Sequence, residues 1–243
     1  MDITNSVMLI TGASSGIGAA TARAAAEAGA RVVVVARRED RLRTVAEQSG
    51  GALAIPCDVT DAAAVARAAG RTVDEFGRID IVVNCAGQGL QAGIEELDIA
   101  DLRAVFELNV IAPLVVMQAV LPTMRAQRSG AIVNVSSGIV WSDLPGSAGY
   151  SASKAALEKL TRIARVELAD AGIAVSVMFP SITETEFVSS VRGDVAAALA
   201  LEAGSGLKPD TADHVAAAIL DLVRSGAEQA DLVPIEVGGS LRS

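Results

Sequence analysis

The sequence has few aromatic residues, and this scarcity limits how its core can be built. Only 2% of the 243 residues are aromatic, with one tyrosine and one tryptophan, whereas 51% are hydrophobic. Valine, alanine, isoleucine and leucine must therefore fill the core, as they do in a parallel sheet that is buried on both faces. The length fits one α/β domain that spans residues 1–243.

Positive charge, cysteine and histidine are also scarce. The formal net charge is −9, which argues against nucleic-acid binding through phosphate neutralisation. The two cysteines, Cys57 and Cys85, each end an apolar run, so we expect reduced, buried thiols, as is usual in a cytoplasmic protein. The single histidine, His214, has no second ligand at a suitable spacing, which predicts a surface position and no metal site.

Signals for secretion or for a membrane are not evident. The N-terminal MDITNSV does not resemble a signal peptide. The most apolar long segment, residues 110–124, is interrupted by Pro113, Gln118 and Pro122, so we expect it to fall short of a membrane span. The predicted location is the cytoplasm, with no membrane partner.

Strand-like and helix-like segments alternate along most of the chain. Helices between continuous apolar runs imply βαβ crossovers, so we predict a single-domain, Rossmann-like, doubly wound parallel sheet of about seven strands with helices on both faces. Residues 182–208 break the rhythm, with glycines but no expected strand, and we expect an inserted loop or helical lid over a substrate. The apolar runs lie at residues 7–11, 31–36, 52–57, 80–84, 131–136 and 174–179, with 231–237 as a seventh candidate.

A glycine-rich stretch, TGASSGIG at residues 11–18, joins the first strand to the first helix. Gly12 permits a tight turn, Gly16 lets backbone approach a pyrophosphate, and Gly18 lets the helix pack on the strand. The helix N-terminus then offers free N–H groups and a positive dipole end to an anion. A merely flexible turn is the alternative. The predicted phosphate-binding residues are Gly12, Ser14, Ser15, Gly16, Ile17 and Gly18.

The end of the second strand indicates which dinucleotide is preferred. NAD sites usually place a carboxylate there, whereas this chain has Ala36 followed by Arg37 and Arg38. A guanidinium can bind a 2′-phosphate with both of its arms. The two arginines could also be solvated residues that open a surface helix. We predict that NADP(H) is preferred and that NAD(H) remains possible.

The only tyrosine lies in YSASK, residues 150–154, four residues before a lysine. Residues four apart share one face of a helix, so Lys154 can place its charge near the Tyr150 hydroxyl. A neighbouring cation favours the phenolate, and we expect it to lower the pKa of Tyr150 from its usual value of about 10. Tyr150 could then donate a proton to a carbonyl oxygen or remove one from an alcohol.

These motifs together resemble the short-chain dehydrogenase/reductase family over about residues 7–185. The resemblance rests on TGASSGIG, CDVT at 57–60, NCAG at 84–87, Asn109, Ser137 and YSASK. It implies that Asn109, Ser137, Tyr150 and Lys154 are catalytic. Ser137 would hydrogen-bond the substrate oxygen, and Asn109 would hold a water that links Lys154 to solvent. The thirteen-residue interval to Tyr150 selects Ser137 over Ser136.

The same resemblance implies further coenzyme contacts. Asp58 would bind the adenine amino group with Val59 beside it, and Asn84, Ala86 and Gly87 would line the adenosine ribose. Pro180, Thr183 and Thr185, together with Tyr150 and Lys154, would contact the nicotinamide half. The chain departs from the family pattern at Cys85, where an asparagine is usual, and at Ser181, where a glycine is usual.

The substrate is expected to be a small apolar carbonyl compound or alcohol. Ser137, Trp141 and Phe187 are the predicted substrate-binding residues, although the Trp141 indole could instead be packed under the inserted segment. The leading hypothesis is an NADP(H)-dependent oxidoreductase. The alternatives are a lyase or epimerase of the same superfamily and a dinucleotide sensor or scaffold without turnover. The resemblance also implies a homodimer or homotetramer that pairs helices near 102–124 and 151–169.

Overall fold

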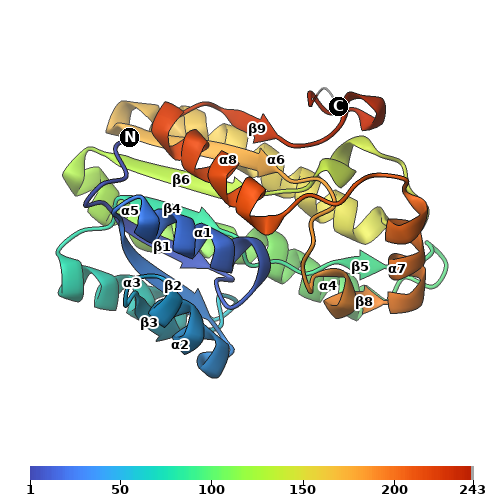
Figure 1. The fold of residues 1–243 in the computed structure, drawn as a ribbon, viewed down its shortest axis with the longest axis horizontal. Coiled ribbons are helices and arrows are strands. Elements are labelled where there is room, and N and C mark those ends of the chain that lie inside the picture. Colours follow the sequence, from blue (N-terminus) through green and yellow to red (C-terminus); the bar gives the residue numbers. More distant parts are fainter. Residues whose placement is uncertain (242–243) are drawn as a thin grey trace.

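The computed structural model describes residues 1–241, and a parallel seven-stranded sheet lies at its centre (Figure 1). The strand order is β3-β2-β1-β4-β6-β7-β9. This arrangement confirms the predicted doubly wound α/β domain. The strands are β1 (Val7–Thr11), β2 (Arg31–Ala36), β3 (Leu53–Pro56), β4 (Ile81–Asn84), β6 (Gly130–Val135), β7 (Ile173–Phe179) and β9 (Gln229–Asp231).

Helices cover both faces of the sheet because successive strand side chains point to opposite sides. In β1, Met8 and Ile10 join one buried cluster with α1, α2 and α8. Val7 and Leu9 join a second cluster with α3, α5 and the C-terminal part of α6. The helices are α1 (Gly16–Glu27), α2 (Glu39–Gln48), α3 (Ala62–Phe76), α4 (Ile99–Phe106), α5 (Ala112–Gln127), α6 (Ala148–Leu168), α7 (Val195–Gly204) and α8 (Ala212–Ser225).

The strand order reverses between β1 and β4, which are parallel neighbours in register from Met8 and Ile81 to Thr11 and Asn84. From β1 the chain proceeds outward to β2 and β3, and from β4 it proceeds the other way to β6 and β7. The loops that leave β1 and β4 therefore diverge. In open α/β sheets a ligand binds in the crevice outside the carboxyl ends of the strands at such a point.

Two predictions about strands are wrong. The seventh strand occupies Gln229–Asp231 and not 231–237, because Pro234 has no N–H to donate and residues Ile235–Val237 form a 3₁₀ turn. The 182–208 segment does contain a strand: the two-residue β8 (Arg192–Gly193) pairs with β5 (Leu90–Gln91). This small second sheet attaches the segment to the chain that follows β4.

The helical stretch from Ile99 to Gln127 is longer than the sequence suggested. It continues through Pro113 and Pro122, and by length and composition it could cross a membrane, so the expectation that it falls short is wrong. This is weak evidence for a membrane span, since a core helix of a soluble protein passes the same test. Val116, Val120 and Met124 lie fully buried against the sheet, as in such a core helix.

Candidate active site

A cleft of about 1050 Å³ opens at the carboxyl ends of the strands and is bounded on one side by the 182–208 segment. Of the coenzyme-binding residues predicted from the sequence, all line this cleft except Asn84. Those that do are Gly12, Ser14, Ser15, Gly16, Ile17, Gly18, Arg37, Arg38, Asp58, Val59, Ala86, Gly87, Tyr150, Lys154, Pro180, Thr183 and Thr185.

The glycine cradle is formed by close backbone contacts that leave no room for side chains. Gly12 has φ 67°, and a Cβ there would lie 2.7 Å from the Cα and the nitrogen of Ala86. A Cβ on Gly18 would lie 2.6 Å from the carbonyl oxygen of Gly12. The loop after β1 is thus pressed against the loop after β4 and against its own helix, the geometry that a pyrophosphate site requires.

The N-terminus of α1 faces this cradle without a side-chain cap. Ser15 is the N-cap residue, and its hydroxyl makes no capping hydrogen bond. The first N–H groups of the helix and the positive end of its dipole are therefore available to an anion in the cleft. Together with the space that the glycines leave, this donor set fits a dinucleotide.

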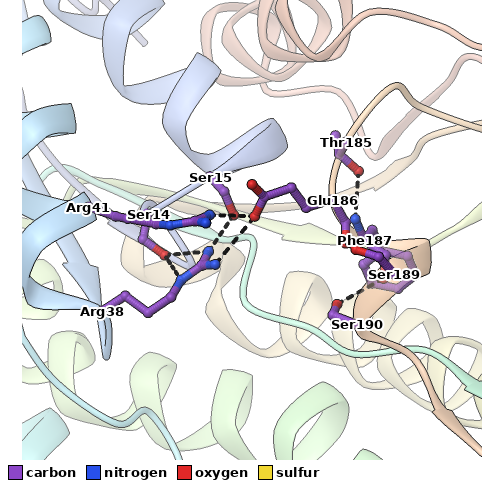
Figure 2. A network of polar contacts seen from close by, with 9 residues as sticks. All are labelled: Ser14, Ser15, Arg38, Arg41, Thr185, Glu186, Phe187, Ser189 and Ser190. Atoms are coloured by element: carbon purple, nitrogen blue, oxygen red, sulfur yellow. Dashed lines mark hydrogen bonds and ion pairs between the residues drawn. The ribbon is translucent and has the colours of Figure 1, made fainter.

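Arg38, and not Arg37, reaches the cradle. Its Nε and NH2 donate to Ser14 Oγ at 3.1 and 3.0 Å, and NH2 also donates to Ser15 Oγ at 2.6 Å (Figure 2). Arg37 lines the cleft nearer to Asp58. The pKa of that carboxyl is lowered mainly by the Thr60 backbone N–H, with a smaller contribution from Arg37.

The four predicted catalytic residues are near neighbours: Ser137 lies beside Tyr150, Tyr150 beside Lys154, and Lys154 and Asn109 both beside Gly87. Lys154 Nζ donates to the Val135 carbonyl oxygen at 2.8 Å and lies 5.9 Å from the centre of the Tyr150 ring. A Cβ on Gly87 would lie 3.4 Å from Lys154 Nζ and 3.3 Å from Asn109 Oδ1. Tyr150 and Lys154 belong to the first two turns of α6, whose N-terminal end faces the cleft.

Burial, and not a neighbouring charge, dominates the titration of this pair. Desolvation raises the pKa of Tyr150 to about 12, and hydrogen bonding to Ser137 only partly opposes it. Desolvation likewise lowers the pKa of Lys154 to about 8. The expectation that Lys154 lowers the pKa of Tyr150 is therefore wrong for the protein without ligands. The free-energy cost of removing either charged group from water exceeds the energy gained from the attraction between the two charges.

The two adjacent serines after β6 have different roles. Ser136 is buried and donates its hydroxyl to the Lys154 carbonyl oxygen at 3.1 Å, which ties β6 to α6. Ser137 Oγ accepts the Ile139 N–H at 3.3 Å and lines the cleft beside Tyr150. The Ser137 hydroxyl lies within hydrogen-bonding reach of the Tyr150 hydroxyl, so both groups face the cleft at the same point.

Asn109 lies in a π-helical turn (Glu107–Ile111) between α4 and α5, a feature not predicted from the sequence. Its side chain is fully engaged: Nδ2 donates to the Gln88 carbonyl oxygen and Ser153 Oγ, and Oδ1 accepts the Gln88 N–H. Pro113 cannot donate to the Asn109 carbonyl at the α-helical spacing. A water bound here would therefore hydrogen-bond to main-chain groups of the turn. Pro113 is the sequence feature from which this turn could have been predicted.

Three predicted site residues do not line the cleft: Asn109, whose side chain is held in the π turn as described above, Asn84 and Trp141. Asn84 is buried within the sheet, where its Nδ2 donates to Asn134 Oδ1 at 2.8 Å, so it positions β4 against β6 and does not line a ribose site. Trp141 packs against Phe179, with 4.6 Å between ring centres, and against the C-terminal segment around Val237. Its hypothetical role as a pocket wall is therefore not supported, and its packing partner is not the 182–208 segment.

The remaining departures from the family pattern are accommodated without strain. Ser181 does not have a positive φ, so the loop after β7 does not need the conformational freedom of glycine there. Cys85 lines the cleft, and burial raises its pKa to about 12, which keeps it a thiol. Cys57 is buried. His214 is half exposed and pairs with Asp210 at 2.8 Å on the surface.

Of the residues that form the substrate end of the cleft, Phe187 was predicted from the sequence, and its ring centre lies 5.7 Å from that of Tyr150. The others come from four separate parts of the chain and are brought together only by the fold. They include Gln88, Leu90, Leu144, Leu201, Val233 and Val237. The fold and cleft together define a class: a doubly wound protein with a dinucleotide cradle and a tyrosine–lysine–serine cluster at one end.

The chain belongs to the short chain dehydrogenase family, whose model matches residues 6–196. It is 40% identical to the cis-4-hydroxycyclohexanecarboxylate dehydrogenase of Sinomonas cyclohexanicum over 198 residues, which cover 80% of each chain. A short-chain dehydrogenase structure from Streptomyces avermitilis is 33% identical, with a TM-score of 0.84 over 96% of this chain and 90% of that one.

A second solved structure is similar to this chain and was determined with a coenzyme. It is the 3-ketoacyl-(acyl-carrier-protein) reductase from Brucella melitensis complexed with NADH, with 26% identity and a TM-score of 0.84 over 95% of this chain and 97% of that one. Family and relatives confirm that this protein is an oxidoreductase acting on CH–OH groups with a nicotinamide dinucleotide.

Proposed function

We propose that the protein interconverts a ketone and a secondary alcohol with NADP(H), and that Tyr150 is the general acid and base. The observation that carries this proposal is the position of Tyr150, Ser137 and Lys154 in the same cleft as the glycine cradle. A coenzyme whose pyrophosphate bound to the cradle would share this cleft with these three side chains.

In the proposed mechanism the protein orients the substrate and moves a proton, while the nicotinamide ring supplies or accepts the hydride. Ser137 donates a hydrogen bond to the substrate oxygen. Tyr150 is neutral near pH 7, since its pKa is about 12, and can donate its proton to the oxygen that develops negative charge. Lys154, when protonated, stabilises the phenolate that remains. The π turn at Asn109 would hold the water through which the proton is replaced.

The preference for NADP(H) rests on Arg38. Its guanidinium is held over the cradle by Ser14 and Ser15, and Ala36 leaves no carboxylate at the end of β2 to bind a 2′-hydroxyl. Arg38→Ala should weaken NADPH binding about 10- to 100-fold, because a charge-assisted phosphate contact is lost. NADH binding should change less than threefold, and equal losses for both coenzymes would favour an NAD(H) enzyme.

The substrate is proposed to be apolar and uncharged. Among the cleft-lining residues the cations are Arg37 and Arg38 at the coenzyme end and Lys154 at the catalytic centre. The substrate end holds Glu202 and apolar side chains from α7 and the C-terminal segment. A carboxylate on the substrate would find no cationic partner among these lining residues, so cyclohexanol and its ketone should be turned over far better than their carboxylate derivatives.

Tyr150→Phe tests the central step. The variant should lose turnover by a factor of about 10³ or more, while NADPH affinity stays within a few-fold, because the hydroxyl transfers the proton and the ring mainly packs. NADPH absorbance with a panel of ketones measures the first, and calorimetry measures the second. Wild-type protein that binds NADPH but reduces no ketone would favour the sensor alternative, and a variant that retains turnover would contradict the mechanism.

Assembly, location and the role of the 182–208 segment complete the proposal. Ile111 on the π turn and Ile163 and Val166 on α6 are exposed apolar residues on the helices expected to pair. Covering them in a homodimer or homotetramer would remove this surface from water, and sedimentation tests it. We further propose that the protein is cytoplasmic and that the 182–208 segment is a lid over the substrate.

A further inference from the structure

The carboxylate of Glu186 already occupies the anion-binding face of Arg38. Glu186 Oε2 lies 3.4 Å from Arg38 NH1 and also pairs with Arg41 NH1 (Figure 2). Arg38 precedes α2 and Arg41 lies in its first turn, so both guanidinium groups reach the same side of the helix. Hydrogen bonding to Arg41, more than to Arg38, holds the pKa of Glu186 below its usual value, so the carboxylate is ionised.

Glu186 reaches these arginines from the opposite wall of the cleft. It follows Thr185, whose methyl group would lie 3.1 Å from a Cβ on Gly16, and it precedes Phe187 beside Tyr150. The carboxylate therefore lies at the coenzyme end of the cleft, where it contacts Nη1 of Arg38 while the Ser14 and Ser15 hydroxyls contact Nε and Nη2 of the same guanidinium. The other acidic residues of this helix end, Glu39 and Asp40, pair with Arg43.

We propose that Glu186 is an internal competitor for the 2′-phosphate of the coenzyme and thereby sets the selectivity between phosphorylated and unphosphorylated dinucleotides. This inference rests on the proposed placement of the 2′-phosphate at Arg38. A phosphate there must displace the carboxylate from Arg38 or bind beside it against like charge. An unphosphorylated ribose does neither, so Glu186 weakens NADP(H) binding while leaving NAD(H) binding nearly unchanged.

The test uses the adenosine half of the coenzyme, so that neither substrate nor turnover is involved. Calorimetry would measure the affinities of adenosine 2′,5′-bisphosphate and of AMP for the wild type, Glu186→Gln and Glu184→Gln. Glu184 is an exposed residue of the same segment and makes no ion pair with any residue in the described range 1–241, so the control removes the same charge. Glu186 is more than half exposed, and melting temperatures would verify that both variants fold.

Glu186→Gln should raise the ratio of bisphosphate to AMP affinity about three- to tenfold, as expected for one like charge at short range in water, and high salt should reduce the rise. Glu184→Gln should leave the ratio within twofold of wild type. An unchanged or lowered ratio in Glu186→Gln, or an equal rise in both variants, would overturn the proposal. A wild-type ratio near one would contradict the proposed NADP(H) preference instead. The proposed role of Glu186 would still be tested by the change from that wild-type ratio in Glu186→Gln.

Discussion

Two alanine-rich helices border the cleft, and the protein uses them differently. α1 (GIGAATARAAAE) has six buried residues and packs against the sheet and α8. α7 (VAAALALEAG) is more apolar in composition, yet none of its residues is buried. Composition alone therefore did not decide burial. We call the side of the cleft formed by α1 and the glycine cradle the fixed wall, and the side formed by α7 and the rest of the 182–208 segment the exposed wall. We expect substitutions on the two sides to have very different effects.

The largest effect is expected where the fixed wall is tightest. Gly12→Ala puts a methyl group 2.7 Å from the Ala86 backbone at a φ of 67°, so the loops after β1 and β4 must separate. We expect coenzyme affinity to fall at least about 100-fold, together with a loss of roughly 1–3 kcal/mol of unfolding free energy from the backbone strain. Calorimetry with NADPH and denaturant unfolding measure the two effects.

Gly51→Ala is the matched control for that change. Gly51 has φ 79°, but nothing lies within 4 Å of the added methyl group. It should show the cost in unfolding free energy and no loss of coenzyme affinity. If both variants bound NADPH as the wild type does, the cradle would not be the coenzyme site.

Lys154→Met should separate function from stability. Turnover should fall at least about 100-fold, whereas the free energy of unfolding should rise by on the order of 1–3 kcal/mol, because a desolvated cation is removed from α6. The pKa of Lys154 is about 8 in the folded chain and 10.5 when unperturbed. The gain should therefore be full below pH 8, decline between pH 8 and about 10.5, and vanish above that range.

Urea unfolding of the coenzyme-free protein at several pH values measures this gain. Lys159→Met, on the exposed face of the same helix, should change neither turnover nor stability appreciably. A Lys154→Met variant that is less stable than wild type at pH 7 would mean that the bond from Nζ to the Val135 carbonyl outweighs the desolvation cost.

The smallest effects compare the two helices directly. Ala22→Leu in α1 inserts a large side chain at a fully buried position and should cost about 1–3 kcal/mol. Ala196→Leu in α7 makes the same change at an exposed position and should cost less than about 0.5 kcal/mol. Thermal or denaturant unfolding measures both. Equal costs would mean that α7 is covered in solution, for example by another subunit.

Much of the coenzyme half followed from local sequence. Continuous valine and isoleucine runs identified six strands closely, and the seventh was displaced because Leu232 and Val233 are buried without being part of a strand. Gly12, Ser137, Tyr150 and Lys154 all line the cleft. Tyr150 and Lys154 share one helix face, whereas Gly12 and Ser137 lie in the loops that leave the carboxyl ends of β1 and β6. Asn84 did not, because a residue at a strand end can point into the sheet as readily as out of it.

Local sequence was enough to predict the alternation of strands and helices, the glycine turn, and the shared helix face of Tyr150 and Lys154, because each depends on residues near one another in the chain. Three other features follow from the tertiary structure. It removed Tyr150 and Lys154 from water enough to reverse the expected shift in the tyrosine pKa, it placed Trp141 against Phe179, and it brought Glu186 to Arg38 and Arg41. These depend on desolvation and on contacts across more than a hundred residues or between separate elements, which no local pattern encodes.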